Sequence, residues 1–307
     1  IIFCSLYNLC ANILRAVGDS KTPLIFLGIS VVLNIVLDLM FIRAFDMGVR
    51  GAAIATDISQ ALAGILALIY ILVKAKHLIP EKDEYSVEKS DRSDLIQSAL
   101  AMGFMSCIVN IGTVILQRAI NGLGTDIVTA HTAARKIFDI MFMLYIVGNA
   151  VTTYVSQNMG AGRYDRVHQG VRAAIIINTI ITTVMIIFGW LLSPALIKLV
   201  AGTSASAIID PAVRYVRIGV TCFYVLGPLF VLRCAMQGMG RKIVPVMSST
   251  IELVGKVLAV MILTPRLGYL GVTITEPIIW FCCTLMLSIM YLTTPVEKLV
   301  EKRRAAN

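Results

Sequence analysis

Long apolar runs separated by short polar breaks dominate the chain. Most runs are about twenty residues long or longer, which is the length that an α-helix needs to cross the hydrocarbon core of a bilayer. The runs cover residues 1–14, 24–45, 51–73, 95–120, 127–155, 171–192, 212–236, 246–263 and 271–292. The first run is too short to span and is interpreted as the tail of a helix. We therefore predict an all-α, polytopic membrane protein with about nine helices.

The composition excludes a water-soluble fold. Hydrophobic residues make up 58% of the chain and charged residues 15%, and the mean hydropathy is +0.84. Soluble domains carry about a quarter charged residues, so this chain lacks the polar surface that water requires. The net charge is +9, but the basic residues gather in a few short loops, and we expect no nucleic-acid partner. The seven Cys residues lack metal-site spacing, and we expect no metal.

The distribution of Lys and Arg predicts the orientation of the helices. Basic residues are retained on the cytoplasmic side of a membrane. One set of alternate loops and the C-terminal tail holds sixteen of them, at 15–21, 74–92, 163–172, 241–242 and 298–304, whereas the other set holds five. We therefore expect the first set and the C-terminus to be cytoplasmic.

A polar segment divides the chain into unequal lobes. Residues 74–94 are rich in charged residues, and we interpret them as a cytoplasmic inter-lobe linker. Residues 1–73 are then the remainder of an N-terminal lobe. Residues 95–292 form a C-terminal lobe of six helices, and residues 293–307 form a basic cytoplasmic tail.

Two pairs of matching stretches indicate a parallel internal repeat. Residues 15–23 match 237–245, and both stretches have a Gly followed five residues later by a Pro. Residues 47–54 match 267–274, and both matches fall at turns between consecutive helices. Parallel repeats build secondary transporters in which the substrate cavity lies between the two lobes. The repeat therefore predicts a two-lobed helical bundle.

Three motifs resemble the multidrug and toxic compound extrusion (MATE) family of transporters. Residues 15–23, Arg-Ala-Val-Gly-Asp-Ser-Lys-Thr-Pro, resemble the loop between the family's helices four and five. Residues 48–56 resemble the entry to its helix six, and residues 157–162 the exit from its helix eight. The similarity covers the whole chain. It implies twelve helices in two six-helix lobes, so that about nine are present here and the first three are lacking.

The resemblance implies a secondary active antiporter in the cell membrane. Such a protein exports amphipathic or cationic organic compounds by alternating access, coupled to the entry of H+ or Na+. It is a multi-pass protein of the bacterial inner membrane, works as a monomer and needs no resident cofactor. We do not expect an enzyme, because the sequence has no nucleophile-base constellation and no phosphate loop.

Two other functions remain open. A lipid-linked oligosaccharide flippase of the same superfamily shares the lobed architecture but requires a more basic cavity for pyrophosphate. The basic residues within or near predicted helices are Arg135, Lys136, Arg214, Arg217, Arg233 and Lys256. A truncated, non-transporting membrane protein is the other alternative, and it would show no ion-dependent flux even as the complete gene product.

A carboxylate inside an apolar run is the first candidate for ion coupling. A charge in hydrocarbon costs about 3 kcal/mol on insertion scales, so each one requires a reason. Asp38 lies well inside its run, and Asn34 lies four residues earlier on the same helix face. The resemblance implies a cation site made of these two residues with Asn8 and Thr56. The alternative is a hydrogen-bond network that only holds helices together.

Three further residues are candidates for the substrate cavity. Gln117 and Asn121 lie four residues apart, and they either line the cavity or cap a helix end. Glu276 occupies the place that Thr56 takes in the first repeat, and it is a candidate for a second protonatable group.

Two other charged pairs are interpreted as structural. Glu252 and Lys256 are spaced to form an intrahelical ion pair, as are Arg135 and Asp139. Some members of the family carry coupling carboxylates on helices seven and ten. The corresponding apolar stretches here contain none, so we do not predict a second cation site in the C-terminal lobe.

Overall fold

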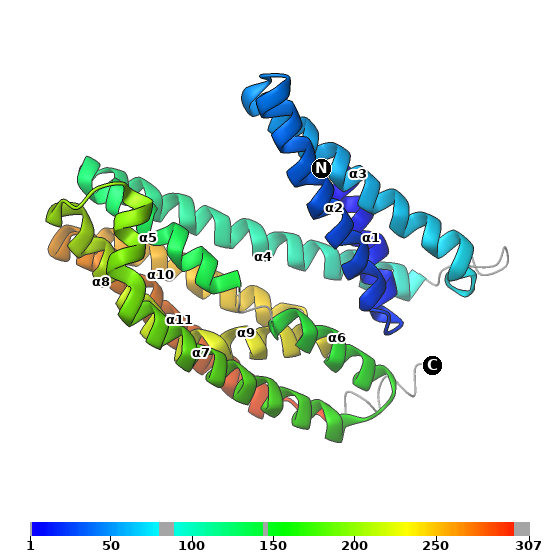
Figure 1. The fold of residues 1–307 in the computed structure, drawn as a ribbon. Helices are drawn as coiled ribbons and strands as arrows, with labels where there is room; N and C mark the ends of the chain where they lie inside the picture. Colours follow the sequence, from blue (N-terminus) through cyan, green and yellow to red (C-terminus); the bar gives the residue numbers. More distant parts are fainter. Residues whose placement is uncertain (1, 80–88, 144–146, 298–307) are drawn as a thin grey trace. The chain divides into compact units, whose positions relative to one another are not determined.

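The computed structural model describes residues 2–79, 89–143 and 147–297, and the regular structure in these ranges is helical (Figure 1). The helices are α1 (Ile2–Ala16), α2 (Lys21–Leu39), η1 (Met40–Ala44), α3 (Gly48–Lys74), η2 (Lys76–Leu78), α4 (Lys89–Asn121), α5 (Thr125–Met143), α6 (Val147–Gly160), α7 (Tyr164–Ala201), α8 (Ser206–Thr221), α9 (Phe223–Gly238), α10 (Ile243–Leu267) and α11 (Tyr269–Leu292). The all-α prediction is confirmed. Parts of the predicted linker and tail, residues 80–88 and 298–307, lie outside the described residues.

Most of these helices have the length and composition of membrane spans. Six segments within the described ranges qualify: Lys21–Ala44, Gly48–Lys74, Arg92–Asn121, Tyr164–Ala201, Ile243–Leu267 and Tyr269–Leu292. The bent pair α8 and α9 counts as a seventh when it is taken as one span. Their outer faces are apolar, with Val114 68% exposed and Leu292 81% exposed. Such side chains are stable facing lipid and unfavourable in water.

In the run 127–155 the described helices are α5 and α6, and residues 144–146 lie outside the described residues. The run 212–236 is interrupted, and the prediction of a single helix was wrong there. The run 212–236 contains α8 and α9, which meet at Cys222 with a bend of 51°. Pro228 lies in the second turn of α9 and has no N–H to donate. Proline is the usual cause of a sharp kink in a helix.

The chain divides into two compact units, Ile1–Asp91 and Arg92–Asn307, which we describe separately. In the first unit α1, α2 and α3 pack through small residues. Ala11 of α1 and Ala63 and Ala67 of α3 are fully buried in one cluster. Small side chains allow close approach of helices in a membrane, where the hydrophobic effect does not drive helices together.

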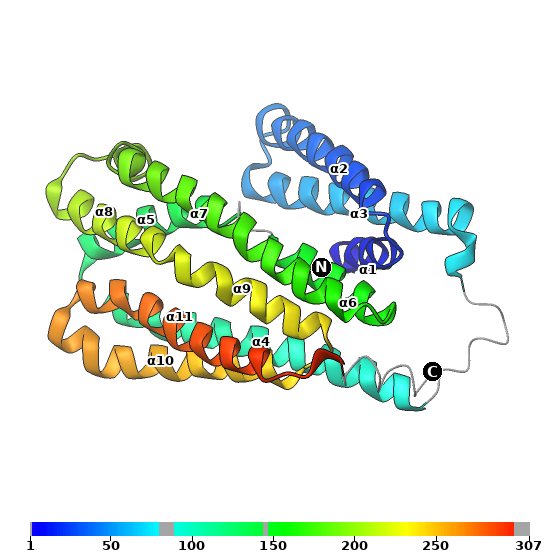
Figure 2. The same ribbon diagram turned by 90° about the horizontal axis from the view of Figure 1, so that it is seen from below.

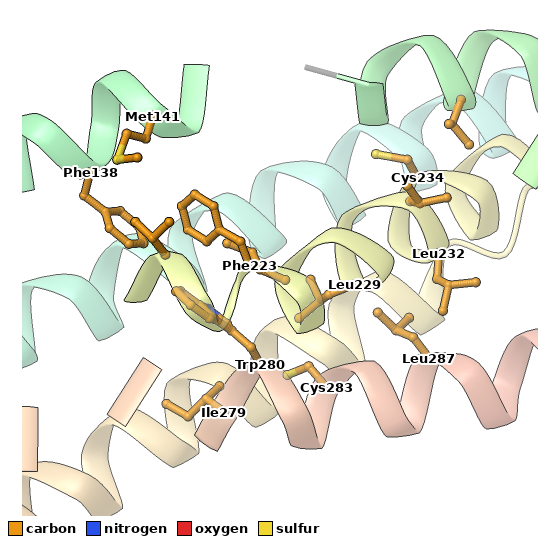
Figure 3. Packing of buried hydrophobic residues seen from close by; sticks show 14 of the residues in the cluster. Phe138, Met141, Phe223, Leu229, Leu232, Cys234, Ile279, Trp280, Cys283 and Leu287 are labelled. Carbon is orange, nitrogen blue, oxygen red and sulfur yellow. The ribbon is translucent and has the colours of Figure 1, made fainter. Parts of the chain in front are cut away.

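The second unit holds α4 to α11 around a larger apolar core. Phe138 of α5, Phe223 of α9 and Trp280 of α11 meet in this core (Figure 3). The ring centroids of Phe138 and Phe223 are 4.9 Å apart, in an edge-to-face arrangement. Leu232 of α9 and Leu287 of α11 continue the contact further along the same helices. α10 and α11 form an antiparallel hairpin and lie side by side (Figure 2).

Two glycines at matching places in the predicted repeat make the same kind of close contact. Gly51 lies at the start of α3, and a Cβ there would be 2.9 Å from Cβ of Phe41 and 3.2 Å from its carbonyl carbon. Gly271 lies at the start of α11, and a Cβ there would be 2.6 Å from the carbonyl oxygen of Leu263. In both units the glycine lets a helix pass close to the end of the preceding helix.

We expect Gly271→Ala to lower the thermal unfolding temperature of the protein in detergent. The new methyl group would collide with backbone atoms of Leu263, which cannot rotate away, and overpacking of this kind costs about 1–3 kcal/mol. Gly103→Ala in α4 is the matched control, because a Cβ there meets nothing within 4 Å, and alanine favours a helix over glycine. Equal melting temperatures for the two variants would contradict the contact.

Candidate functional site

The predicted coupling residues Asn34 and Asp38 lie on α2, in the first unit. Both residues are half-buried. Nδ2 of Asn34 and Oδ1 of Asp38 are buried atoms that have no hydrogen-bond partner among the described residues. Oε1 of Gln60, on the neighbouring helix α3, is also buried and has no hydrogen-bond partner among the described residues. Most buried polar atoms in proteins have a partner, so each of these three atoms is unusual.

Two contacts establish how α2 and α3 align. The hydroxyl of Ser30 donates to the carbonyl oxygen of Ser59 at 2.7 Å, and Phe41 packs against Gly51. The two helices are antiparallel, so the stretch of α2 between these contacts, which contains Asn34 and Asp38, lies beside the stretch of α3 from 51 to 59. That stretch contains Thr56, and Gln60 follows it directly.

Thr56 is therefore at the same level as the predicted pair. Its hydroxyl donates to the carbonyl oxygen of Ala52 at 2.9 Å, which leaves the oxygen free to accept or to coordinate. Gln60 was not predicted from the sequence. Its position four residues after Thr56, on the same face of an apolar helix, was the signal that could have identified it.

The structure does not bring Asn8 to this group. Asn8 donates to the carbonyl oxygen of Cys4 at 2.9 Å, within its own helix. α1 packs on α3 where Leu6 meets Gly64, and it contacts α2 where the hydroxyl of Tyr7 donates to the carbonyl oxygen of Pro23. α1 thus begins partway along α3 (Figure 1). Asn8 lies about ten residues further along α3 than Thr56, which is about 15 Å at helical rise.

The second unit contains a separate group of buried charges around Glu252. Lys256 of α10 donates to Glu252 at 3.0 Å, so the predicted intrahelical pair is present. Arg233 of α9 also pairs with Glu252 at 3.6 Å and donates to the hydroxyl of Ser248 at 2.7 Å. The side chain of Lys256 is only 4% exposed, and its ammonium contacts the hydroxyl of Thr113 on α4 at 3.4 Å. One carboxylate therefore forms ion pairs with two cationic side chains.

A second charged group forms around Glu276 of α11. Its carboxylate accepts from Arg135 of α5 at 3.4 Å and from the hydroxyl of Tyr215 of α8 at 3.2 Å. Arg135 also pairs with Asp139 at 3.0 Å, as its spacing predicted. Glu276 thus holds three helices together.

Both groups line one cavity of about 280 Å3 in the second unit. Three cations and two carboxylates face it, together with the rings of Phe138 and Trp280. The cationic members are Arg135, Arg233 and Lys256, and the acidic members are Glu252 and Glu276. The cavity could accept a small polar group surrounded by aromatic walls.

The amide pair predicted for this lobe lies outside the residues that line that cavity. Gln117 donates to Asn121 at 2.9 Å, and both side chains are in the last turns of α4. This hydrogen bond pairs a donor of one side-chain amide with the acceptor of the other. Their role in a substrate cavity remains a prediction.

Comparison with known proteins identifies related sequences and folds. The sequence profile of the family described as MatE matches residues 101–262. The probable multidrug resistance protein YpnP of Bacillus subtilis is 32% identical over 169 residues, which are 54% of this chain and 37% of that protein. The probable multidrug resistance protein YoeA of the same organism is 28% identical over 263 residues, which are 82% of this chain and 56% of that protein. The matched part of the chain thus spans a little more than half of the length of YoeA and less than half of the length of YpnP.

The fold has solved counterparts as well. A crystal structure described as MATE in the bent conformation has a TM-score of 0.84 with this chain at 19% sequence identity, and the match covers 98% of this chain and 67% of that one. At this identity the likeness shows the shared fold.

We expect Glu252→Gln to destabilise the protein strongly. The change would leave Arg233 and Lys256 without their shared counter-charge in a buried place, and breaking a buried pair costs about 3–5 kcal/mol. The matched control is Asp139→Asn, whose side chain is 59% exposed and whose pair contributes about 0.2–1 kcal/mol. Thermal unfolding in detergent measures both, and similar losses of stability would show that the Glu252 group is not a structural tie.

Proposed function

Because the chain belongs to the MatE family, we propose that the protein is a secondary active antiporter that exports amphipathic or cationic organic compounds. Members of the family are transporters rather than enzymes, and the chain is a multi-pass membrane protein. The two Bacillus relatives described as probable multidrug resistance proteins support small organic compounds as cargo. The bacterial relatives also support the cell membrane as its location.

The proposed coupling ion, H+ or Na+, binds at Asp38. The observation that carries this proposal is the set of buried atoms without partners on Asn34, Asp38 and Gln60. A network that only tied α2 to α3 would pair these atoms across the helix contact. Two of the three atoms, Oδ1 of Asp38 and Oε1 of Gln60, are oxygens that suit a proton or a hard cation, whereas Nδ2 of Asn34 is a donor.

Binding of a cation would change the balance of forces between α2 and α3. An ionised Asp38 is costly in hydrocarbon, and a bound H+ or Na+ removes most of that cost. The contact between α2 and α3 would then be more stable in the ion-bound form, which gives the ion a preference for one conformation. A ligand shifts a conformational equilibrium only through such a preference.

Two further parts of the proposal concern orientation and assembly. The sixteen basic residues in one set of loops and the tail favour a cytoplasmic C-terminus. We also propose that the protein acts as a monomer without a resident cofactor. Glu276, Gln117 and Asn121 remain proposed contacts for cargo in the second unit.

We expect Asp38→Asn to abolish ion-driven efflux by the full-length gene product. The amide cannot take up a proton and lacks the charge that attracts a cation; the loss of about 1.4 kcal/mol of binding free energy already lowers ion affinity about tenfold. The measurement is export of a cationic dye from proteoliposomes under an imposed H+ or Na+ gradient. Asp57→Asn is the control, because this neighbouring carboxylate on α3 is exposed. Normal coupling in Asp38→Asn would refute the proposal.

A second series of variants tests which residues belong to the proposed ion site. We expect Asn34→Ala and Thr56→Ala to raise the ion concentration needed for half-maximal efflux, because both residues lie at the level of Asp38. Asn8→Ala should have a smaller effect, since Asn8 lies about 15 Å away along the helices. An effect of Asn8→Ala as large as that of Asn34→Ala would show that α1 reaches the site in the working protein.

A further inference from the structure

Basic residues gather in a second cavity, at one end of α7 and α8. The cavity has a volume of about 620 Å3, and its lining includes Lys198 of α7 and Asp210, Arg214 and Arg217 of α8. It shares no residue with the two groups described above. Neither the proposed coupling site nor the proposed cargo cavity accounts for these charges.

One face of each helix supplies the cavity. On α7 the lining residues Trp190, Pro194 and Lys198 are spaced by four, which places them on one face. On α8 the charged residues follow one another at intervals of three or four, so they also share a face. α7 and α8 are joined by a short turn around Gly202 and run antiparallel, and the two faces enclose the cavity.

The length of α7 places this cavity at a membrane surface. No charged residue occurs between Arg172 and Lys198, and these 26 residues extend about 39 Å along a helix. A bilayer with its headgroups is about 40–45 Å thick, around a hydrocarbon core of about 30 Å. Lys198 therefore lies at the level of the lipid headgroups. Trp190 lies about 12 Å deeper along α7, on the hydrocarbon side of that level.

The charges in this cavity are not neutralised by the protein. Three basic residues face a single acidic one, Asp210. Across the described part of the chain, none of these four residues makes an ion pair within 4.0 Å. The cavity therefore carries two uncompensated positive charges beside the hydrocarbon, where such charges are unfavourable.

Arg217 is held in place but is not fully satisfied. Its guanidinium lies over the ring of Trp190 at 5.0 Å and donates to the carbonyl oxygen of Trp190 at 3.0 Å. The indole N–H of Trp190 in turn donates to the hydroxyl of Thr221 at 3.1 Å. Nε of Arg217 is buried without a hydrogen-bond partner in the described structure. A rigid, under-satisfied guanidinium suits a phosphate group, which accepts from several donors at once.

The surface beside the cavity suits acyl chains. Leu191 is 72% exposed and Leu199 is 79% exposed, and both lie on the adjacent strip of α7. We propose that this cavity binds the phosphate headgroup of an anionic phospholipid, with Lys198, Arg214 and Arg217 around the phosphate and the acyl chains along α7. The two uncompensated charges select an anionic lipid over a zwitterionic one.

Native mass spectrometry of the full-length gene product tests this proposal without any transport assay. The protein is delipidated in a neutral detergent and offered phosphatidylglycerol or phosphatidylcholine. We expect phosphatidylglycerol to be retained in preference to phosphatidylcholine. Arg217→Gln should weaken phosphatidylglycerol binding about fivefold, which is the contribution of one basic residue near an anionic surface. The matched control is Arg266→Gln, an exposed basic residue in the last turn of α10, which should bind as the unchanged protein does.

Three results would overturn the proposal. Equal retention of the two lipids would remove the role of charge. Equal phosphatidylglycerol binding by Arg217→Gln and the unchanged protein would show that the lipid does not bind in this cavity. Displacement of phosphatidylglycerol by excess inorganic phosphate would assign the cavity to a soluble anion. Size-exclusion chromatography monitors folding; if Arg217→Gln does not fold, Arg214→Gln and Lys198→Gln replace it, and unchanged phosphatidylglycerol binding in both would likewise contradict the proposal.

Discussion

A charge in hydrocarbon must be neutralised by a partner or remain available to a ligand, and this constraint organises the polar interior of the protein. Around Glu252 and Glu276, in the second unit, the rule is satisfied within the protein. Glu252 is paired with Arg233 and Lys256, and Glu276 with Arg135. In the first unit it is not, because Oδ1 of Asp38 has no partner among the described residues. The contrast separates structural carboxylates from the one proposed to bind an ion.

Much of the fold could be predicted from the sequence because helix length and apolarity are local properties. The runs 24–45, 51–73 and 171–192 correspond to α2, α3 and α7, and the intrahelical pair of Glu252 and Lys256 follows from a spacing of four. The break at Cys222 was missed, because the chain also has prolines inside helices that are not broken, such as Pro194 of α7 and Pro277 of α11. The composition of the surrounding run gives no sign of the difference.

Long-range pairing was beyond the reach of sequence spacing. Arg135 meets Glu276 across 141 positions, and no pattern within either helix indicates the other. The position of Asn8 shows the same limit. The resemblance placed it in the ion site, but helix register decides which residues lie at one level, and register depends on contacts such as Leu6 with Gly64. The proposed site therefore rests on α2 and α3, where Gly51 and Ser59 align the helices.

Infrared difference spectroscopy of the purified full-length gene product tests the central claim most directly. Spectra recorded at high and low pH, with and without Na+, report the carboxyl groups that bind an ion, whether or not cargo moves. The account predicts one carboxyl band that responds to H+ or Na+ and belongs to Asp38. This band is present in the unchanged protein and in Glu276→Gln, and it is absent in Asp38→Asn. Persistence of the signal in Asp38→Asn, with its loss in Glu276→Gln, would place ion binding in the second unit and contradict the account.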